Sequence, residues 1–543
     1  MWLVIGFFFK SSWKVIIFAA VVSAIAAGAN LYSLKLLSDI ITGTTQNLYV
    51  LLGYVSALTI ASSVITLYSG RYVTKYFDLK VANYRKELAE KSLLAKYDKI
   101  EGKLHKLVPI LLFETNLIGG FGNSIPNLMV AVFQSTVVLA YLFQVSWVLT
   151  IAFLPIFIIV SVANVLTLPL FKKFEKAISD TRFKLHFSLD RLEKGFKDLI
   201  VNKQHSSSYI NGPINDPNQK LVEIGMKNYF LRSLLDKSES VFVLISLGLL
   251  LVYAMTSGTF VENELIEYMA LILYIRPSLN RIAGFTKHVK VVENALEQVE
   301  SLDLDIKKSL LETEDKAIYK EASNHPLITV QNATYSYKGK NSFKLQDIDF
   351  EIKENEIVII NGSNGSGKST LFKLIIGLYS PKKGEVCFQG HPVDNDNIQS
   401  YRSYFSCYFT DSPLFDDLSY VVSEADKAKT NELIDMLGLT DKTSLDDGFT
   451  IKNSNLSNGQ RGRLNLLRLL LEDRSVYFLD EWAANQDIYF KERFYNEIVP
   501  DLKKRGKTVI LISHDDKFYS VADRIITLKN GKIQNTVTPN AVS

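Results

Sequence analysis

The segment that most constrains the fold is a glycine-rich loop between a short apolar strand and an apolar helix. The strand is expected over Ile357–Ile360, the loop covers residues 361–370 (NGSNGSGKST), and the helix is expected from Leu371 onward. This is a complete GxxxxGK[ST] pattern in the strand, loop, helix context that it requires. Main-chain N–H groups of such a loop surround phosphate oxygens, while Lys368 supplies charge and Ser369 is a candidate Mg²⁺ ligand. The residues expected to contact a nucleotide here are Asn364, Gly365, Ser366, Gly367, Lys368, Ser369 and Thr370.

A second turn suited to phosphate binding lies about ninety residues later. It reads LSNGQ over residues 456–460 and precedes an apolar helix, so Ser457, Gly459 and Gln460 would offer polar groups at a helix N-terminus. One nucleotide does not need two phosphate cradles from the same chain. The pattern therefore implies that a second copy of the chain completes each site.

Two adjacent carboxylates follow a second buried strand, expected over Val476–Leu479. Asp480 is a candidate Mg²⁺ ligand, acting through water, and Glu481 is a candidate general base for an attacking water, a role worth about 10² to 10⁴ in rate. A third strand over Thr508–Ile512 ends next to His514, which we expect at the same sheet edge, contacting a γ-phosphate. A solvated loop and a structural histidine are the alternatives, but the preceding buried strands disfavour both.

The apolar residues of this 543-residue chain are unevenly distributed, with long runs in about the first 290 residues and alternating strand and helix patterns in about the last 220. A membrane-spanning helix needs about 20 apolar residues. Six runs approach that length: Val15–Leu34, Leu48–Tyr68, Ile125–Gln144, Trp147–Leu170, Val241–Met255 and Leu265–Gly284. The fifth is short, and the sixth contains Glu267 and Arg276, each of which costs about 2.5 to 3.5 kcal/mol at a bilayer centre.

The loop charges predict the orientation of these spans. Residues 71–106 contain ten lysines and arginines and residues 172–237 contain thirteen, whereas the three short connections contain none. By the positive-inside rule, the two long connections and both termini face the cytoplasm. A cleavable signal peptide is the alternative for the first run, but that run continues for about twenty residues and a second follows closely.

The two long connections also have helical patterns, and we expect turns near Tyr97–Leu104 and Gln204–Gly212 to contact the soluble half. The alternative is that both are solvated helix faces. Polar residues within the spans are candidates for a substrate path, although amides at such positions often bond between helices and Arg276 can reach the headgroups instead. These candidates are Asn30, Gln134, Gln144, Asn164, Glu267 and Arg276.

Charge and cysteine content exclude several other classes. The net charge of +4 is small for this length and no basic tract with interleaved aromatics occurs, so nucleic acid is not an expected partner. Cys387 and Cys407 provide neither a disulfide framework nor a CxxC metal spacing, which favours a reducing, cytosolic environment for the second half.

On these motifs the second half resembles the nucleotide-binding domain of an ABC transporter. Residues 362–370 match the family's Walker A motif, 456–460 its signature motif, and 476–480 its Walker B motif. The resemblance implies that Glu481 is the catalytic glutamate, His514 the switch histidine, and Tyr337 the aromatic that stacks on adenine. It also implies ATP and Mg²⁺ as ligands, and a homodimer in which the signature of one chain closes on the Walker A motif of the other.

Six spans fused ahead of one such domain are similar to a half-transporter of the exporter type. We therefore expect an all-α six-span transmembrane domain over residues 1–300, a linker over 301–326, and an α/β P-loop NTPase domain over 327–543. Two departures from the family pattern are visible. Thr410 stands where the family has a glutamine, so Thr410 or Asp411 would substitute, and residues 482–487 read WAANQD where the family has a sequence like PTSALD.

The run DEWAANQD, with LSNGQRGRL, SHDDKFYSVADRI and KGFKDLIVNK, resembles the bacterial exporters of cyclic peptides and peptide siderophores. The resemblance implies ATP-driven export of a peptide-like cargo across a bacterial inner membrane, in contact with membrane lipid. A flippase for a lipid-linked molecule or amphipathic drug is the first alternative. An ATP-gated channel or sensor is the second.

Overall fold

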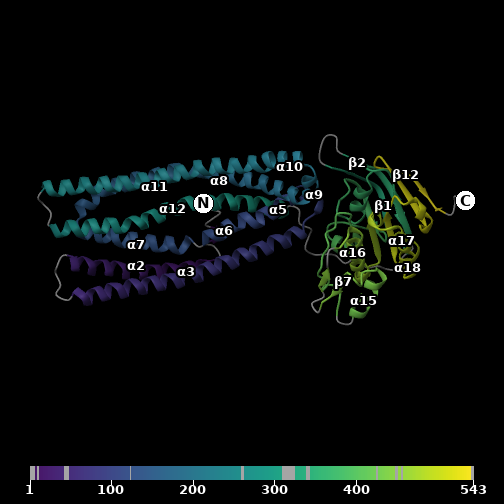
Figure 1. The fold of residues 1–543 in the computed structure, drawn as a ribbon, viewed down its shortest axis with the longest axis horizontal. Coiled ribbons are helices and arrows are strands. Elements are labelled where there is room, and N and C mark those ends of the chain that lie inside the picture. Colours follow the sequence, from purple (N-terminus) through teal and green to yellow (C-terminus); the bar gives the residue numbers. More distant parts are fainter. Residues whose placement is uncertain are drawn as a thin grey trace. The chain divides into compact units, whose positions relative to one another are not determined.

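The computed structural model of the protein describes residues 6–8, 12–41, 48–122, 124–257, 262–307, 325–337, 343–423, 426–446, 450–453 and 456–539. It divides into two compact units, one of residues 1–93 and 102–308 and one of residues 94–101 and 309–543. The first is helical and the second combines helices with sheets (Figure 1), which confirms the predicted fold class. The domain limits at 300 and 326 stay a prediction, because residues 308–324 of the expected linker lie outside the described residues.

Long helices that run side by side make up the first unit (Figure 1). The helices of this unit are α2 (Trp13–Ile41), α3 (Leu48–Leu93), α5 (Leu104–Pro109), α6 (Thr115–Gly122), α7 (Ser124–Val145), α8 (Trp147–Lys194), α9 (Phe196–Val201), α10 (Lys203–Tyr209), α11 (Asn215–Ser257) and α12 (Glu262–Lys307), with π-helical turns η2 (Ile110–Glu114) and η3 (Ile210–Ile214). Each of the six expected spans lies on one of these helices. Helices are the natural form for such segments, because they satisfy their own backbone hydrogen bonds in lipid.

By length and composition, three helical stretches among the described residues are apolar enough to cross a membrane: Trp13–Leu37, Tyr49–Leu93 and Tyr97–Val145. They cover the first three expected spans, except for Leu48 at the start of the second. The other three lie on α8, α11 and α12, and their crossing of a membrane stays a prediction. Helices α3 and α8 continue well past their apolar runs, as the charged helical patterns of the two long connections predicted.

The second unit is built on a six-stranded sheet with the order β12-β11-β3-β10-β9-β6, beside a four-stranded sheet β2-β1-β4-β5 and a hairpin β7-β8. The strands are β1 (Ile328–Ser336), β2 (Lys344–Ile352), β3 (Ile357–Asn361), β4 (Lys383–Phe388), β5 (His391–Pro392), β6 (Phe405–Tyr408), β7 (Thr443–Leu445), β8 (Ile451–Asn453), β9 (Val476–Asp480), β10 (Thr508–Ile512), β11 (Arg524–Lys529) and β12 (Lys532–Val537). The helices are α4 (Tyr97–Ile100), α13 (Lys368–Ile375), α14 (Ile398–Arg402), α15 (Lys427–Met436), α16 (Asn458–Glu472), α17 (Ile488–Arg493) and α18 (Val499–Lys504), with short turns η5 (Trp482–Asn485), η6 (Phe494–Ile498) and η7 (Asp516–Val521).

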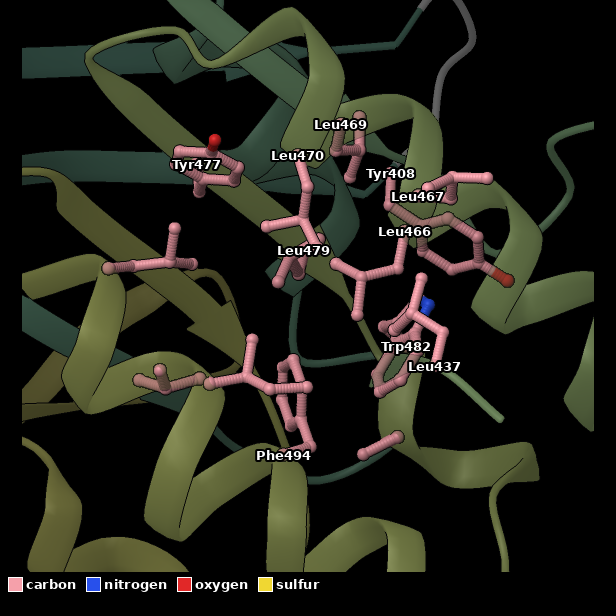
Figure 2. Close-up of a cluster of buried hydrophobic side chains, with 14 of the residues drawn as sticks. Tyr408, Leu437, Leu466, Leu467, Leu469, Leu470, Tyr477, Leu479, Trp482 and Phe494 are labelled. Carbon is pink, nitrogen blue, oxygen red and sulfur yellow. The ribbon is translucent and has the colours of Figure 1, made fainter. Parts of the chain in front are cut away.

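The central strands β3, β9 and β10 are buried along nearly their whole length, as parallel strands covered on both faces must be. One apolar cluster lies between the two larger sheets and α13. A second joins β9 and β10 to α16 and η6, where Leu466, Leu467, Leu479, Trp482 and Phe494 meet (Figure 2). These two clusters hold the sheet edge at which the predicted site residues gather.

Parallel pairing brings the carboxyl ends of three strands to one edge. Ile360 of β3 pairs with Ile512 of β10, and Ile512 pairs with Asp480 of β9. The segments that follow these strands are the glycine-rich loop, the Asp480–Glu481 pair and Ser513–His514. This edge is where open α/β sheets generally bind ligands.

Candidate functional site

The glycine-rich loop has a backbone that only glycine fits at two positions. Gly362 has φ of 151°, and a Cβ there would lie 2.3 Å from the Leu528 carbonyl oxygen. Gly367 has φ of 108°, and its Cβ would lie 2.5 Å from the ring of Phe343. The loop therefore keeps a shape in which its main-chain N–H groups remain available at the start of α13, as a phosphate cradle requires.

Lys368 begins α13 and is folded back over the loop. Its Nζ donates to the carbonyl oxygens of Gly362 at 2.9 Å and Ser363 at 3.3 Å, and the side chain is buried. Burial lowers its pKa, while the nearby Glu481 and Asp480 act in the opposite direction. These two carbonyl bonds hold the ammonium at the loop, where phosphate oxygens can replace them.

Asp480 ends β9 as a buried carboxyl group with one oxygen, Oδ1, that has no hydrogen-bond partner. Burial, together with the charge of Glu481, raises the pKa of Asp480 to about 6, although a hydrogen bond from Ser369 and the charge of Lys368 act to lower it. A buried acceptor without a partner is costly. The Ser369 and Asp480 oxygens therefore form a small oxygen-rich site beside the loop.

Glu481 has a left-handed backbone, with φ of 52°, which is strained for a residue with a side chain. Its N–H donates to the Ile512 carbonyl at 3.0 Å, which holds this conformation against β10. The His514 Nε2 lies 3.3 Å from Glu481 Oε1. Both side chains stay partly exposed, so each can reach a water or a ligand at this edge.

Thr410 and Asp411 follow β6 and lie near the same carboxylate. The Thr410 hydroxyl donates to the main-chain oxygen of Asp480 at 3.0 Å, whereas the charge of Asp411 contributes to the raised pKa of the Asp480 side chain. Thr410 is therefore engaged with the backbone of β9. Asp411 is the better candidate of the two for contacts with ligands.

The predicted signature turn begins helix α16 with a complete capping box. Ser457 Oγ accepts from the Gln460 N–H at 3.2 Å, and the Gln460 side chain accepts from the Ser457 N–H at 2.9 Å. Both side chains are thus used to cap the helix. These two bonds stay within the turn and do not run to the glycine-rich loop.

The segment of residues 482–487, which departs from the family pattern, bonds to the first turns of helix α16. Trp482 Nε1 donates to the Gly462 carbonyl at 2.7 Å, and Gln486 Nε2 donates to the Gly459 carbonyl at 3.0 Å. Arg463 bonds to both Gln486 and Asp487. A Cβ on Gly459 would come within 3.0 Å of a main-chain oxygen of this segment. Residues 482–487 therefore fix the position of the helix end that carries Ser457.

Tyr337 follows β1, and its hydroxyl lies 3.1 Å from Thr370 Oγ1. The Tyr379 hydroxyl donates to Glu101 at 2.9 Å and its oxygen lies 3.3 Å from the Tyr337 hydroxyl, while Lys373 Nζ donates to Glu101 at 3.1 Å. Burial acts to raise the pKa of Glu101, but these hydrogen bonds outweigh it and leave the pKa lowered. A chain of hydroxyl groups thus joins the predicted adenine-stacking residue to the turn of residues 94–101.

Sequence reasoning expected a contact near Tyr97–Leu104 but did not identify its residues. The structure supplies them: Glu101 and Tyr97 lie against Tyr379 in the same compact unit. No local pattern marks Tyr379 as a partner of a residue 278 positions away. The second expected contact, at Gln204–Gly212, stays a prediction.

The candidates for a substrate path are dispersed over the first unit. Asn30 and Gln134 line one cavity together. Glu267 accepts from the Tyr141 hydroxyl and Arg276 donates to Ser240, so both have helix-to-helix partners. Gln144 is exposed, and the Asn164 side chain lies outside the described residues.

Three comparisons with known proteins agree with this geometry. Residues 345–484 match the ABC transporter family. Over its length the chain aligns with the structure of a bacterial Atm1-family ABC exporter with ATP bound, with a TM-score of 0.74 and 14% identity, covering 98% of this chain and 96% of that one. The second unit thus contains a segment that matches the ABC transporter family, and the chain has the fold of that ABC exporter.

Among curated proteins, the chain is 43% identical over 217 residues to the ATP-binding protein SyrD of Pseudomonas syringae pv. syringae, which covers 39% of this chain and 38% of that protein. It is 25% identical over 418 residues to the ATP-dependent lipid A-core flippase of Haemophilus influenzae, which covers 73% of this chain and 68% of that protein. The chain thus spans well under half the length of the first relative and about two thirds of the second.

Proposed function

We propose that the protein is an ATP-driven exporter that moves its cargo across a bacterial inner membrane by alternating access. The observation that carries this proposal is the meeting of Lys368, Asp480, Glu481 and His514 at one sheet edge. The same chain has three helical stretches, among the described residues, that are apolar enough to cross a membrane. The ATP-binding domain and both termini would face the cytoplasm, in line with the loop charges.

ATP would bind with its phosphates in the loop of residues 362–370 and its adenine on Tyr337. Mg²⁺ fits beside them, because Asp480 has a free buried oxygen and the Ser369 hydroxyl is close. No group of three or more histidine, cysteine or acidic side chains suited to a metal occurs among the described residues, so phosphate oxygens would complete the shell. When bound, Mg²⁺ would neutralise phosphate charge.

Hydrolysis would depend on Glu481 as general base and His514 as a γ-phosphate contact. The 3.3 Å contact between the two side chains supports a common task, since both can approach one water from this edge. Thr410 would hold the β9 backbone, and Asp411 would take the contact that a glutamine makes in the family pattern.

A second copy of the chain would complete each ATP site. Ser457 and Gly459 begin α16 within a capped turn whose recorded bonds do not run to the chain's own loop. In a head-to-tail homodimer this turn would close on the partner's nucleotide. Closure would shift the spans toward outward access only if ATP binds the closed state more tightly.

A mixed dimer tests this sharing of sites. In the first heterodimer one chain carries Ser457→Ala and its partner carries Lys368→Met, and in the second heterodimer both changes lie on one chain beside a wild-type partner. When the two changes affect the same composite site, the other site stays intact and we expect about half of wild-type ATP hydrolysis. When the two changes lie on one chain, both sites are damaged and hydrolysis should be lost, as measured by phosphate release. Equal activity in the two arrangements would contradict the shared-site dimer.

The pH dependence of Mg²⁺ binding follows from the Asp480 pKa of about 6. Below that pH the carboxyl is protonated and neutral, and a metal ligand must be ionised. From pH 7 to pH 5 we expect the Mg²⁺ dissociation constant of the ADP complex to rise about tenfold, by calorimetry corrected for the ionisation of ADP. The Asp480→Asn variant has no carboxyl group to ionise at this position. It should bind Mg²⁺ weakly at both pH values, without the tenfold rise in the dissociation constant. An unchanged wild-type constant would contradict the assignment.

The proposed cargo is a cyclic or otherwise modified peptide, on the resemblance of DEWAANQD and its companion segments. The similarity to a lipid A-core flippase over 73% of the chain favours a lipid-linked molecule as the second candidate. ATP-dependent uptake into inverted membrane vesicles, scored by mass spectrometry against peptides from the producing cell, tests the first. Stimulation of ATP hydrolysis by lipids alone would favour the second, and ATP-gated downhill flux would indicate a channel.

A further inference from the structure

The first unit contains a cavity of about 730 Å³ whose lining is polar and cationic. Helices α2, α3, α7 and α12 form it. Its described lining includes two arginines, three amide side chains and four hydroxyl groups, but no aspartate or glutamate. The residues that matter most are Asn30, Arg71, Asn127, Gln134 and Arg281.

No carboxylate stands beside Arg71 and Arg281 in the described lining of this cavity. Neither arginine forms an ion pair within the part of the chain that the structure describes. An adjoining cavity of about 570 Å³, which shares Asn127 and Arg281, differs in this respect. There Arg232 lies 3.2 Å from Glu175, and Asp236 also lines the space. Arg281 lines both cavities, and the larger one differs in that its described lining adds Arg71 and contains no carboxylate.

The neutral amide side chain of Asn30 in the larger cavity can donate hydrogen bonds from its N–H groups. The Asn30 amide oxygen accepts from the Ser62 hydroxyl at 2.7 Å, which leaves its N–H groups for another partner. Gln134 is hydrogen-bonded to Tyr274 outside the cavity lining, so it is fixed in place. Arginine presents a planar fork of N–H donors that matches a carboxylate or phosphate.

Cations near apolar helices are energetically costly unless they meet a counter-charge. We propose that this cavity binds the anionic group of the cargo, and that for the peptide cargo of the proposed function, on which this inference rests, the group is a carboxylate. Arg71 and Arg281 approach it from α3 and α12 and set the preference for an anion, while Asn30 and Asn127 supply neutral donors.

Two cyclic peptides that differ only in one glutamate or glutamine side chain test the proposal. The full-length protein in lipid nanodiscs hydrolyses ATP in their presence, and the concentration of peptide for half-maximal stimulation is measured. We expect the wild-type protein to respond to the glutamate peptide at a concentration about tenfold lower, as loss of one charge-assisted bond predicts. Arg281→Gln and Arg71→Gln should each remove most of this preference, while Arg281→Lys should keep part of it.

Two controls separate this effect from misfolding. Lys184→Gln removes an exposed cation of α8 that does not line either cavity, and it should leave the tenfold preference unchanged. The response to the glutamine peptide should be the same in the arginine variants as in the wild type. If one arginine variant loses its response to both the glutamate and the glutamine peptide, its effect is assigned to misfolding. The other arginine variant then shows whether the preference for the glutamate peptide depends on the cavity.

The remaining outcomes overturn the proposal in distinct ways. Equal responses of the wild type to the two peptides exclude an anion-selective cavity. An arginine-dependent response to phosphatidic acid in the nanodisc, without one to the peptides, keeps the anion site but replaces the carboxylate by a lipid phosphate. A failure of the proposed function is detected by a different measurement. In that case inverted vesicles that contain the wild-type protein accumulate no peptide when ATP is supplied.

Discussion

Replacing Glu481 by Gln is expected to leave ATP binding intact and to reduce ATP turnover by about 10² to 10⁴, the usual contribution of a general base. The glutamine side chain has nearly the same shape, so the left-handed turn and the N–H bond to the Ile512 carbonyl should remain. The bonds from Lys368 to the Gly362 and Ser363 carbonyl oxygens do not involve Glu481, so the glycine-rich loop should keep its shape. ATP affinity by equilibrium dialysis and phosphate release in single-turnover mode check the two parts separately.

A matched control is Glu497→Gln, which alters an exposed glutamate of η6 that pairs with Arg493. It should hydrolyse ATP at the wild-type rate. His514→Ala should lower turnover as well, because it removes the group 3.3 Å from Glu481 Oε1. A Glu481→Gln variant that turns over ATP at the wild-type rate would exclude this residue as the base.

The sequence predicted which strand ends meet at this sheet edge, because the signals for those strands are local. A buried strand followed by a polar residue is visible at Asp480 and again at His514, and parallel pairing brings both to the end of β3. The observed strand β9 includes Asp480, one residue beyond the expected end at Leu479. Such differences at element ends are small, because terminal residues share the pairing of their neighbours.

Contacts between residues far apart in the chain were not predictable in the same way. The bonds from Tyr379 to Glu101 and from Thr410 to the Asp480 carbonyl depend on how distant segments pack, and neither partner has a distinctive local pattern. The cationic cavity is a similar case. Arg71 and Arg281 lie 210 positions apart, and only the packing of α3 near α12 shows that they line one space.

The departure of residues 482–487 from the family pattern acquires a physical reason in the packing of Trp482. Its indole ring is buried, with its centroid 4.4 Å from that of Phe494, in the cluster that joins α16 to the sheet (Figure 2). The Nε1–H group reaches the Gly462 carbonyl of α16 at 2.7 Å. One side chain therefore links the segment after Glu481 both to the core and to the helix that begins at the signature turn.

Trp482→Ala should destabilise the ATP-binding domain by about 3–5 kcal/mol, the usual effect of removing a buried tryptophan. Trp482→Phe keeps most of the ring but leaves the buried Gly462 carbonyl without its donor, so about 1–3 kcal/mol is expected. Each kcal/mol should lower the thermal midpoint of this domain by about 2–4 °C, measured by scanning calorimetry of the full-length protein. Tyr489→Ala is the matched control, because Tyr489 is an aromatic residue of the same region that is 82% exposed.

The two Trp482 variants also separate stability from site geometry. If the indole bond to Gly462 positions the signature turn, Trp482→Phe should reduce ATP hydrolysis at a temperature where its domain is still fully folded. ATP affinity of the chain's own loop should not change, because the hydrogen bond of Trp482 runs to Gly462 on α16 and not to that loop. A Trp482→Ala protein as stable as Tyr489→Ala would contradict the packing role, and full hydrolysis by a folded Trp482→Phe protein would contradict the positioning role.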